Sequence, residues 1–199
     1  MRCSQKVLLV LTSAAVIPAI MVTGMQPMKP VQTGSFQDGT VENIASYLKE
    51  RMPEVPEDEL LEIANYVYTE SKERDLDYRL VLAIMKVESN FKREAISSKG
   101  ARGLLQIKPS LGRVIAEDLG VDWSGDRILH EPEKNIKFGV YHLSQLIEDF
   151  DTLPWALYAY NSGSTKARER AAQRKQPGLR FARTVLNEYK RTMIVLPDP

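Results

Sequence analysis

The chain has 199 residues, of which 27% are charged and 43% are apolar, and its formal net charge is +1. This length allows one packed domain with additional terminal segments, and the apolar content is ordinary for a globular protein. A nearly neutral chain is neither a polyanion nor a basic arm, so composition excludes both of these classes.

The N-terminal residues 1–24 have the three-part layout of a secretory signal. MRCSQK carries two basic residues, the uncharged apolar run of residues 7–22 follows, and small residues come next. The run is shorter than the ~20 residues that a membrane-spanning helix usually needs. We therefore expect export to the periplasm or cell envelope, with residues 1–24 either cleaved as a signal peptide or retained as an N-terminal membrane anchor.

Hydrophobic spacing downstream predicts a helical chain. Residues 25–56 read as a Pro- and Gly-containing linker with one short helix, residues 57–193 as the folded domain, and residues 194–199 as a C-terminal tail. Helices are predicted over residues 41–52, 57–74, 78–91, 110–118, 133–150, 154–161, 164–175 and 179–193. Asp77 and Ser110 are the expected N-caps of two of these helices, and Gly120 closes the second.

Strand signals are weak along the whole chain. Leu104, Leu105 and Ile107 read as a short extended segment after the turn-like stretch AISSKGARG. The expected fold class is therefore mainly α, one helical domain with at most a small β-hairpin after Gly100.

One residue of the helix that begins after Asp77 breaks the apolar pattern. Glu88 follows Ile84 by four residues and Val81 by seven, so it lies on their face of the helix. An apolar setting raises the pKa of a carboxyl group, and a carboxylic acid that is still protonated near neutral pH can donate its proton to a leaving oxygen. The alternative is a structural glutamate that is bonded to a backbone amide or paired with an arginine such as Arg93 or Arg102.

The sequence around Glu88 resembles a known family. VESNFKREAISSKGARGLLQIKPS resembles the first signature of the lytic transglycosylase SLT domain, and ALYAYNSG resembles its later signature. Asn135, Gly139, Tyr141 and Leu146 resemble the helix pattern between them. Three blocks in the right order, over about residues 60–189, imply a peptidoglycan-cleaving enzyme with a lysozyme-like α+β fold.

The resemblance assigns site residues position by position. Glu88 matches the family's catalytic acid/base, Ser97 and Gln106 match residues beside it in the sugar cleft, and Tyr160 and Asn161 match the opposite wall. Leu105 and Ser162 stand where the family often has methionine and alanine, and neither change removes a catalytic group. From the residues alone, Tyr160 can equally be a core aromatic, as we expect for Trp155 and Tyr158, and Gln106 can equally satisfy turn backbone.

The implied reaction cleaves the bond between N-acetylmuramic acid (MurNAc) and N-acetylglucosamine (GlcNAc), and it forms a 1,6-anhydro product without water. Ordinary glycosidases use a second carboxylate at about 5–5.5 or 6.5–9.5 Å, and Glu94, the nearest acid in sequence, reads as a solvated or locally paired residue. The rivals are a lysozyme-type hydrolase, a non-catalytic cell-wall-binding scaffold and, more remotely, a nucleic-acid-binding domain.

Cofactors and partners complete the expectations. The resemblance implies peptidoglycan glycan strands as the partner, and we expect no cofactor. The nearly neutral net charge and the export signal argue against nucleic acid, and no protein partner can be named. His130 and His142 are too few for a catalytic zinc site, and we expect each to be solvated or locally bonded. Residues 166–191 hold nine basic residues against two acidic ones, which indicates either solvated helix faces or attraction to an anionic polymer.

Overall fold

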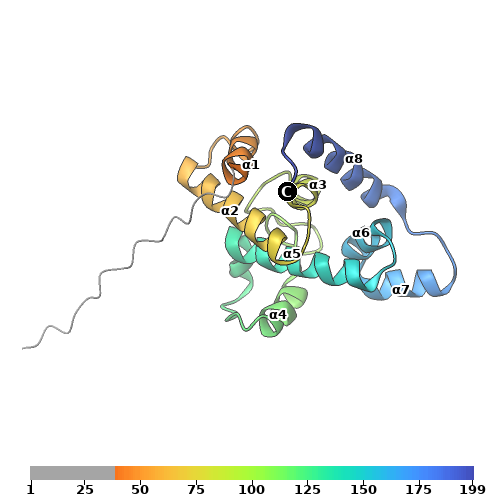
Figure 1. The fold of residues 1–199 in the computed structure, drawn as a ribbon. Helices are drawn as coiled ribbons and strands as arrows, with labels where there is room; N and C mark the ends of the chain where they lie inside the picture. Colours follow the sequence, from red (N-terminus) through yellow and green to blue (C-terminus); the bar gives the residue numbers. More distant parts are fainter. Residues whose placement is uncertain (1–38) are drawn as a thin grey trace, which may run out of the picture. The chain divides into compact units, whose positions relative to one another are not determined.

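The computed structural model describes residues 39–199 (Figure 1). The signal or anchor predicted for residues 1–24, and the predicted linker as far as residue 38, lie outside the described residues. Within the described part the chain forms α-helices and one short 3-10 helix: α1 Thr40–Lys49, α2 Glu57–Glu73, α3 Tyr78–Ser89, α4 Pro109–Asp118, η1 Asp126–His130, α5 Pro132–Asp149, α6 Leu153–Ser162, α7 Ser164–Ala172 and α8 Leu179–Val195. The mainly α prediction is confirmed.

Helix α3 is the buried centre of this arrangement. Its residues from Tyr78 to Met85 are all buried, because apolar side chains occupy almost every position and not one stripe only. The helix packs against α8 on one side and α2 on the other. Asp77 caps its N-terminus by accepting a hydrogen bond from the Arg79 backbone N–H at 2.8 Å, as predicted.

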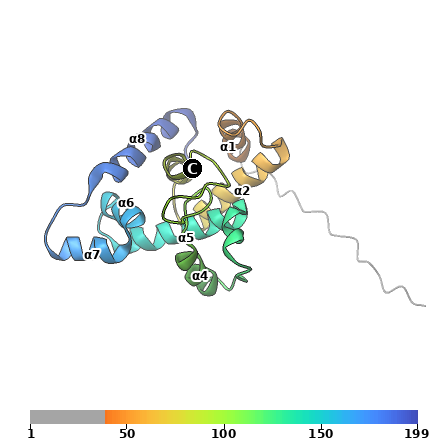
Figure 2. The ribbon, with the colours of Figure 1, turned by 180° about the vertical axis from the view of Figure 1, so that it is seen from behind.

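Helix α5 is the long element beneath this centre (Figures 1 and 2). It packs against α2, α4 and α6, and α6 in turn packs against α7 and α8. Its amphipathic pattern buries Ile136, Val140 and Leu143, which is the stripe that the sequence predicts.

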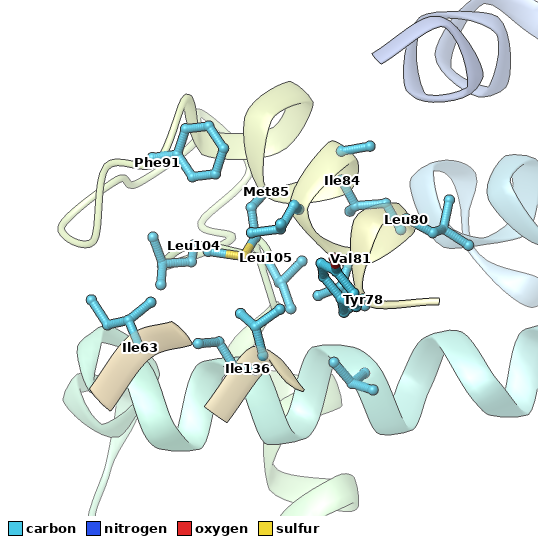
Figure 3. Close-up of a cluster of buried hydrophobic side chains, with 14 of the residues drawn as sticks. Ile63, Tyr78, Leu80, Val81, Ile84, Met85, Phe91, Leu104, Leu105 and Ile136 are labelled. Atoms are coloured by element: carbon cyan, nitrogen blue, oxygen red, sulfur yellow. The ribbon is translucent and has the colours of Figure 1, made fainter. Parts of the chain in front are cut away.

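Side chains from several elements meet in one core (Figure 3). Met85 of α3, Ile63 of α2 and Ile136 of α5 belong to the same buried cluster as Leu104 and Leu105 of the loop after α3. Removing this apolar surface from water is the main force that stabilises the arrangement. The loop is thereby held against the last turn of α3, which carries Glu88.

Two local predictions are wrong. No strand forms in residues 39–199: isolated bridges join Arg102 to Ile96 and to Ile107, and residues 103–106 form a turn in place of the extended segment. Gly103 and Gln106 both have a positive φ, which bends the chain there. Helix α4 begins at Pro109 after an N-cap at Lys108, so Ser110 is not the cap. Proline suits the first position of a helix because its φ is already helical.

The packed body begins earlier than residue 57. Val41, Ile44 and Leu48 lie on one face of α1 and are buried in the main cluster, where α1 packs against α2. The short helix that we placed beside a linker is therefore part of the core. Separately, none of the helices within residues 39–199 is both long enough and apolar enough to cross a membrane.

The segment 194–199 is also attached, although the sequence suggests only a tail. Leu196 is buried, and the Tyr78 hydroxyl donates a hydrogen bond to the Pro197 carbonyl at 2.6 Å. The Arg79 guanidinium pairs with Asp198 at 2.6 Å. These contacts fasten the end of the chain to the start of α3.

Candidate active site

Glu88 lies in the last turn of α3, at the edge of the apolar core. Its side chain is partly buried, and burial raises the pKa of its carboxyl from 4.5 to about 7. Desolvation disfavours the charged form of a carboxyl group, so a large fraction of Glu88 carries its proton at neutral pH. This is the protonation state that a general acid needs.

The two arginines that could have paired with Glu88 have other partners. Arg93 forms an ion pair with Glu59, and Arg102 lies 3.6 Å from Asp126. Within residues 39–199 Glu88 takes part in no ion pair and no side-chain hydrogen bond, and none of those residues perturbs its pKa by charge. The structural alternative, a glutamate paired with Arg93 or Arg102, is therefore wrong.

Backbone conformations that L-residues rarely adopt flank Glu88. Asn90 and Phe91, directly after α3, have φ values of 51° and 62°, and Gln106 has a φ of 51°. Such residues cost roughly 1–3 kcal/mol each and persist only where the surroundings impose them. For Phe91 those surroundings are a buried position and an edge-to-face contact with Tyr47. Strain of this kind gathers at functional sites.

Ser97 and Gln106 shape the loop that faces the end of α3. The Ser97 hydroxyl oxygen accepts hydrogen bonds from the backbone N–H groups of Ala101 at 3.0 Å and Lys99 at 3.3 Å. The Gln106 side-chain amide donates to the carbonyls of Gly103 at 2.9 Å and Ala95 at 3.2 Å. Gln106 thus bonds the backbone of the turn, which is the structural role that the residues alone allow for it. Its side-chain oxygen Oε1 has no hydrogen-bond partner within the described residues.

Tyr160 joins α6 to this loop and lies close to Glu88. Its hydroxyl donates a hydrogen bond to the Leu105 carbonyl at 2.8 Å. Burial, and after it the charge of Glu88, raises the pKa of the Tyr160 phenol well above 10. Asn161 is exposed at the next position, and its side chain makes no hydrogen bond within residues 39–199. Tyr160 therefore lies near Glu88 and is hydrogen-bonded to the loop, whereas the Asn161 side chain bonds neither of them.

Asn135 is the supporting residue whose role sequence reasoning missed. It is buried in α5, accepts a hydrogen bond from the Leu105 N–H at 2.7 Å, and donates to the carbonyls of Leu129 at 2.7 Å and Arg102 at 3.0 Å. One amide therefore bonds three backbone groups, two in the loop after α3 and one in η1. An asparagine on the apolar face of a predicted helix is the signal that could have revealed it.

Two glycines let the loop approach α5 closely. A Cβ atom on Gly139 would lie 2.3 Å from Leu105 Cδ1, and one on Gly103 would lie 2.2 Å from the Leu129 carbonyl oxygen. Neither distance is possible for a larger residue without a shift of the loop. The loop that holds Gln106 and the acceptor of Tyr160 is therefore placed by Asn135, Gly103 and Gly139 together.

The other candidates divide as follows. Glu94 is largely exposed and lies 3.3 Å from His130 Nδ1, which confirms that it is locally paired. His130 Nδ1 also lies 3.2 Å from the Arg93 carbonyl, so its predicted local bonding is confirmed. No three His, Cys, Asp or Glu side chains within residues 39–199 converge as metal ligands would.

His142 differs from the prediction. We expected a solvated or locally bonded ring, but the ring is mostly covered by its packing against Tyr160, with centroids 5.4 Å apart, and its side chain makes no hydrogen bond within residues 39–199. Burial lowers the pKa of His142 to about 4, so the ring is neutral at physiological pH. The helical pattern missed this contact because the partner ring belongs to α6.

Comparison of the sequence with known protein families identifies the family to which these residues belong. The family model of the transglycosylase SLT domain matches residues 65–180, which include every candidate residue above and more than half of the chain. The chain belongs to the transglycosylase SLT domain family. The resemblance seen around Glu88 and Tyr160 is thereby confirmed.

Curated SLT-domain relatives share about a third of the aligned residues. Membrane-bound lytic murein transglycosylase C of Actinobacillus pleuropneumoniae is 36% identical over 104 residues, which is 47% of this chain and 28% of that protein. Membrane-bound lytic murein transglycosylase F of Yersinia enterocolitica is 38% identical over 96 residues, 45% of this chain and 18% of that protein. The chain thus matches less than a third of the length of each of these relatives.

Solved structures support the SLT fold. The 70 kDa soluble lytic transglycosylase of Escherichia coli aligns with a TM-score of 0.54 and 23% identity, over 75% of this chain and 24% of that one. The lytic transglycosylase Slt of Pseudomonas aeruginosa, solved as an inactive glutamate-to-glutamine mutant, aligns with a TM-score of 0.52 and 24% identity, over 66% of this chain and 22% of that one. The lysozyme-like fold expected from the sequence is confirmed.

Proposed function

We propose that this SLT-domain protein is an exported peptidoglycan lytic transglycosylase that cleaves the MurNAc–GlcNAc β-1,4 bond with Glu88 as its single general acid/base. The observation that carries the proposal is the state of Glu88: a carboxyl with a pKa of about 7, free of ion pairs within the described residues. A group that titrates near neutral pH can both give and take back a proton.

The reaction proceeds in two proton transfers at Glu88. Protonated Glu88 donates to the glycosidic oxygen, and the bond between that oxygen and C1 of MurNAc breaks, which releases GlcNAc as an alcohol. The acetamido group of MurNAc stabilises the positive charge at C1. Glu88, now a carboxylate, accepts the proton of the C6 hydroxyl as the C6 oxygen bonds to C1. The 1,6-anhydro ring forms, no water is consumed, and Glu88 is protonated again.

A single-carboxylate mechanism fits the surroundings of Glu88. Ordinary retaining and inverting glycosidases place a second carboxylate at about 5–5.5 or 6.5–9.5 Å. Within residues 39–199 burial is the cause of the raised pKa of Glu88, with no neighbouring carboxylate contributing, and Glu94 is largely exposed beside His130. The Glu88 surroundings therefore favour the transglycosylase over a two-carboxylate hydrolase.

The other candidate residues have supporting roles in this proposal. Tyr160 holds the Leu105 carbonyl and stands beside Glu88, where its phenol can orient the sugar at C1. Ser97 and Gln106 fix the loop and each keep a polar atom for substrate, the hydroxyl hydrogen and the amide oxygen. Asn161, exposed beside Tyr160, offers an amide to the glycan.

Purified sacculi incubated with the protein test this function. We expect soluble muropeptides whose MurNAc ends are lighter by one water than hydrolysis products, as measured by mass spectrometry. Glu88→Gln removes the titrating group with little change in volume, and we expect it to release none. Products of hydrolytic mass would support the lysozyme-type reaction, and wall binding without release by the unaltered protein would support the non-catalytic scaffold.

Location follows from the substrate. Peptidoglycan lies outside the cytoplasmic membrane, so the protein must be exported to reach it, and the basic, apolar and small-residue segments of residues 1–24 are suited to that. Two of the relatives are membrane-bound by name, which is compatible with a retained N-terminal anchor. Cell fractionation of a C-terminally tagged chain tests this, and a tag found only in the cytoplasm would contradict it.

A basic surface extends the proposed interaction with the wall. We define the basic arm as the exposed cations of α7, of the loop after it and of the first turns of α8 that have no ion-pair partner within the described residues: Lys166, Arg174, Lys175, Arg180 and Arg183. The arm begins a few residues after Asn161. Stem peptides of peptidoglycan carry carboxylates, and an array of cations attracts an anionic polymer.

Charge removal tests the basic arm. We expect Arg174→Gln combined with Lys175→Gln to weaken binding to sacculi at low salt and to lose its effect at high salt, where charges are screened. Lys108→Gln at the N-cap of α4, combined with Arg113→Gln within α4, makes the same change in net charge elsewhere and is the matched control. Equal binding by the two pairs would contradict a role for the arm, and retention of the unaltered protein on DNA at physiological salt would favour the nucleic-acid alternative.

A further inference from the structure

His142 lies on the face of α5 that holds the active-site loop. Asn135, Gly139 and His142 follow one another at intervals of four and three residues, so they share one side of the helix. Asn135 binds the Leu105 N–H, and Gly139 contacts the Leu105 side chain. His142, the next position along this face, therefore points from α5 toward the side on which this loop lies.

Tyr160 closes the other side of His142. The two rings pack with centroids 5.4 Å apart and a tilt of 39°. The charge of Glu88 contributes to the raised pKa of the Tyr160 phenol, and the Tyr160 hydroxyl donates a hydrogen bond to the Leu105 carbonyl. The His142 ring thus packs against the same tyrosine that interacts with Glu88.

The polar atoms of His142 are not used by the protein. Neither ring nitrogen forms a hydrogen bond or ion pair within residues 39–199, and neither is among the fully occluded polar atoms that lack a partner there. A mostly covered imidazole whose nitrogens still meet solvent is unlike a core histidine, because buried polar groups are normally satisfied. The neutral ring offers one donor and one acceptor.

We propose that His142 is a substrate-binding residue whose ring nitrogens hydrogen-bond an uncharged polar group, a hydroxyl or an acetamido group, of the glycan bound at Glu88 and Tyr160. This inference rests on the proposed function and extends it to a residue on a third element, α5. A neutral imidazole supplies no charge, so the group recognised belongs to the sugar backbone and not to a stem-peptide carboxylate. Sugar hydroxyls and acetamido groups match its donor and acceptor.

Three substitutions at His142 separate hydrogen bonding from packing. His142→Phe keeps a ring against Tyr160 and removes both nitrogens. His142→Asn and His142→Gln place an amide near the positions of Nδ1 and Nε2, respectively, so one of them retains part of the interaction. Tyr141→Phe, which removes a hydroxyl next to His142 that points to Asp118 at 3.5 Å, is the control for a change in α5.

Binding and turnover are measured separately. For binding, a GlcNAc–MurNAc tetrasaccharide is titrated calorimetrically into Glu88→Gln protein, with and without His142→Phe. We expect His142→Phe to weaken binding about five- to tenfold, as the loss of one neutral hydrogen bond does. In the otherwise unaltered protein we expect KM to rise by a similar factor, the melting temperature to stay the same or rise, and one amide variant to recover part of the loss.

The outcomes distinguish this inference from the function on which it rests. If the unaltered protein releases anhydro-muropeptides and His142→Phe changes neither the tetrasaccharide affinity nor KM, the inference is overturned and the function stands. If Glu88→Gln protein does not bind the tetrasaccharide and the unaltered protein releases nothing, both are overturned. A lower melting temperature with unchanged affinity would make His142 a packing residue only.

Discussion

The Tyr160 hydroxyl donates a hydrogen bond to the Leu105 carbonyl at 2.8 Å across 55 positions of sequence. This bond joins α6 to the loop that α5 holds from the other side through Asn135. Glu88, in the last turn of α3, lies beside the same tyrosine. The hydrogen bond between Tyr160 and Leu105 therefore connects α6 to the loop after α3, and Asn135 connects that loop to α5.

Tyr160→Phe tests whether this bond matters for chemistry as well as for packing. The ring remains, the hydroxyl is lost, and the Leu105 carbonyl is left without its donor, so we expect the free energy of unfolding to fall by about 1–2 kcal/mol. Turnover should fall by roughly tenfold or more, because the phenol also stands beside Glu88. Thermal unfolding and muropeptide release measure the two effects, and full activity in a protein of lowered stability would make Tyr160 a core residue only.

Asn135→Ala should be among the more destabilising single substitutions. It leaves the Leu105 N–H and the Leu129 carbonyl without their side-chain partner in a buried setting. It also removes one of the two donors to the Arg102 carbonyl, which keeps its hydrogen bond from the Ile107 N–H at 3.0 Å. We expect a loss of about 3 kcal/mol in the free energy of unfolding, measured by urea denaturation. Ser144→Ala on the same helix, where the hydroxyl only bonds the Tyr141 carbonyl of its own helix, is the control and should cost far less. Equal losses would contradict the role assigned to Asn135.

Gly139→Ala tests the close approach of the loop to α5. The added Cβ would lie 2.3 Å from Leu105, so we expect a loss of about 1–3 kcal/mol through overpacking. Leu105→Ala alone should also destabilise, because it removes a buried side chain. In the double variant each change makes room for the other, so the two losses should not add. Strict additivity in urea unfolding would show that Gly139 and Leu105 do not interact.

Glu88 should make the stability of the protein depend on pH. Its pKa is about 7 in the folded protein and 4.5 when unperturbed, so the folded state holds the proton more tightly than the unfolded chain. The free energy of unfolding should therefore fall as pH rises from about 4.5 to about 7, by about 3 kcal/mol from this residue, and stay lower above that range. Below pH 4.5 both states are protonated and the contribution vanishes.

Glu88→Gln isolates that contribution. The variant should unfold at a higher temperature than the unaltered protein at pH 8, and the two should differ little at pH 4. Denaturation curves at the two pH values measure the difference. A variant less stable at pH 8 than the unaltered protein would mean that the fold stabilises the Glu88 carboxylate, which would contradict a raised pKa.

The sequence predicts the helices well because their signals are local. Asp77 caps α3 as expected, and Ile84 and Val81 place Glu88 correctly at the edge of an apolar face. The errors are also local in origin. Ser110 has the chemistry of an N-cap, but Pro109 takes the first helical position ahead of it. The segment around Leu105 is apolar like a strand, but the positive φ of Gly103 and Gln106 turns it.

The residues of the candidate active site can be predicted only in part from the sequence. Glu88 can be singled out from spacing, and the family motifs add Ser97, Gln106, Tyr160 and Asn161. The roles of Asn135 and His142 cannot be read in the same way, because they depend on which residues of distant segments meet α5. The ion pair between Arg79 and Asp198 likewise joins residues far apart in the sequence, and no local pattern predicts it.

The most direct measurement is the titration of the Glu88 side chain itself, followed by NMR of carboxyl carbons labelled with carbon-13 and assigned by comparison with Glu88→Gln. We expect one glutamate signal to titrate with a pKa near 7 and to be missing in the variant. If the signal that disappears titrates near or below 4.5, Glu88 is a permanent carboxylate at neutral pH and cannot be the proton donor.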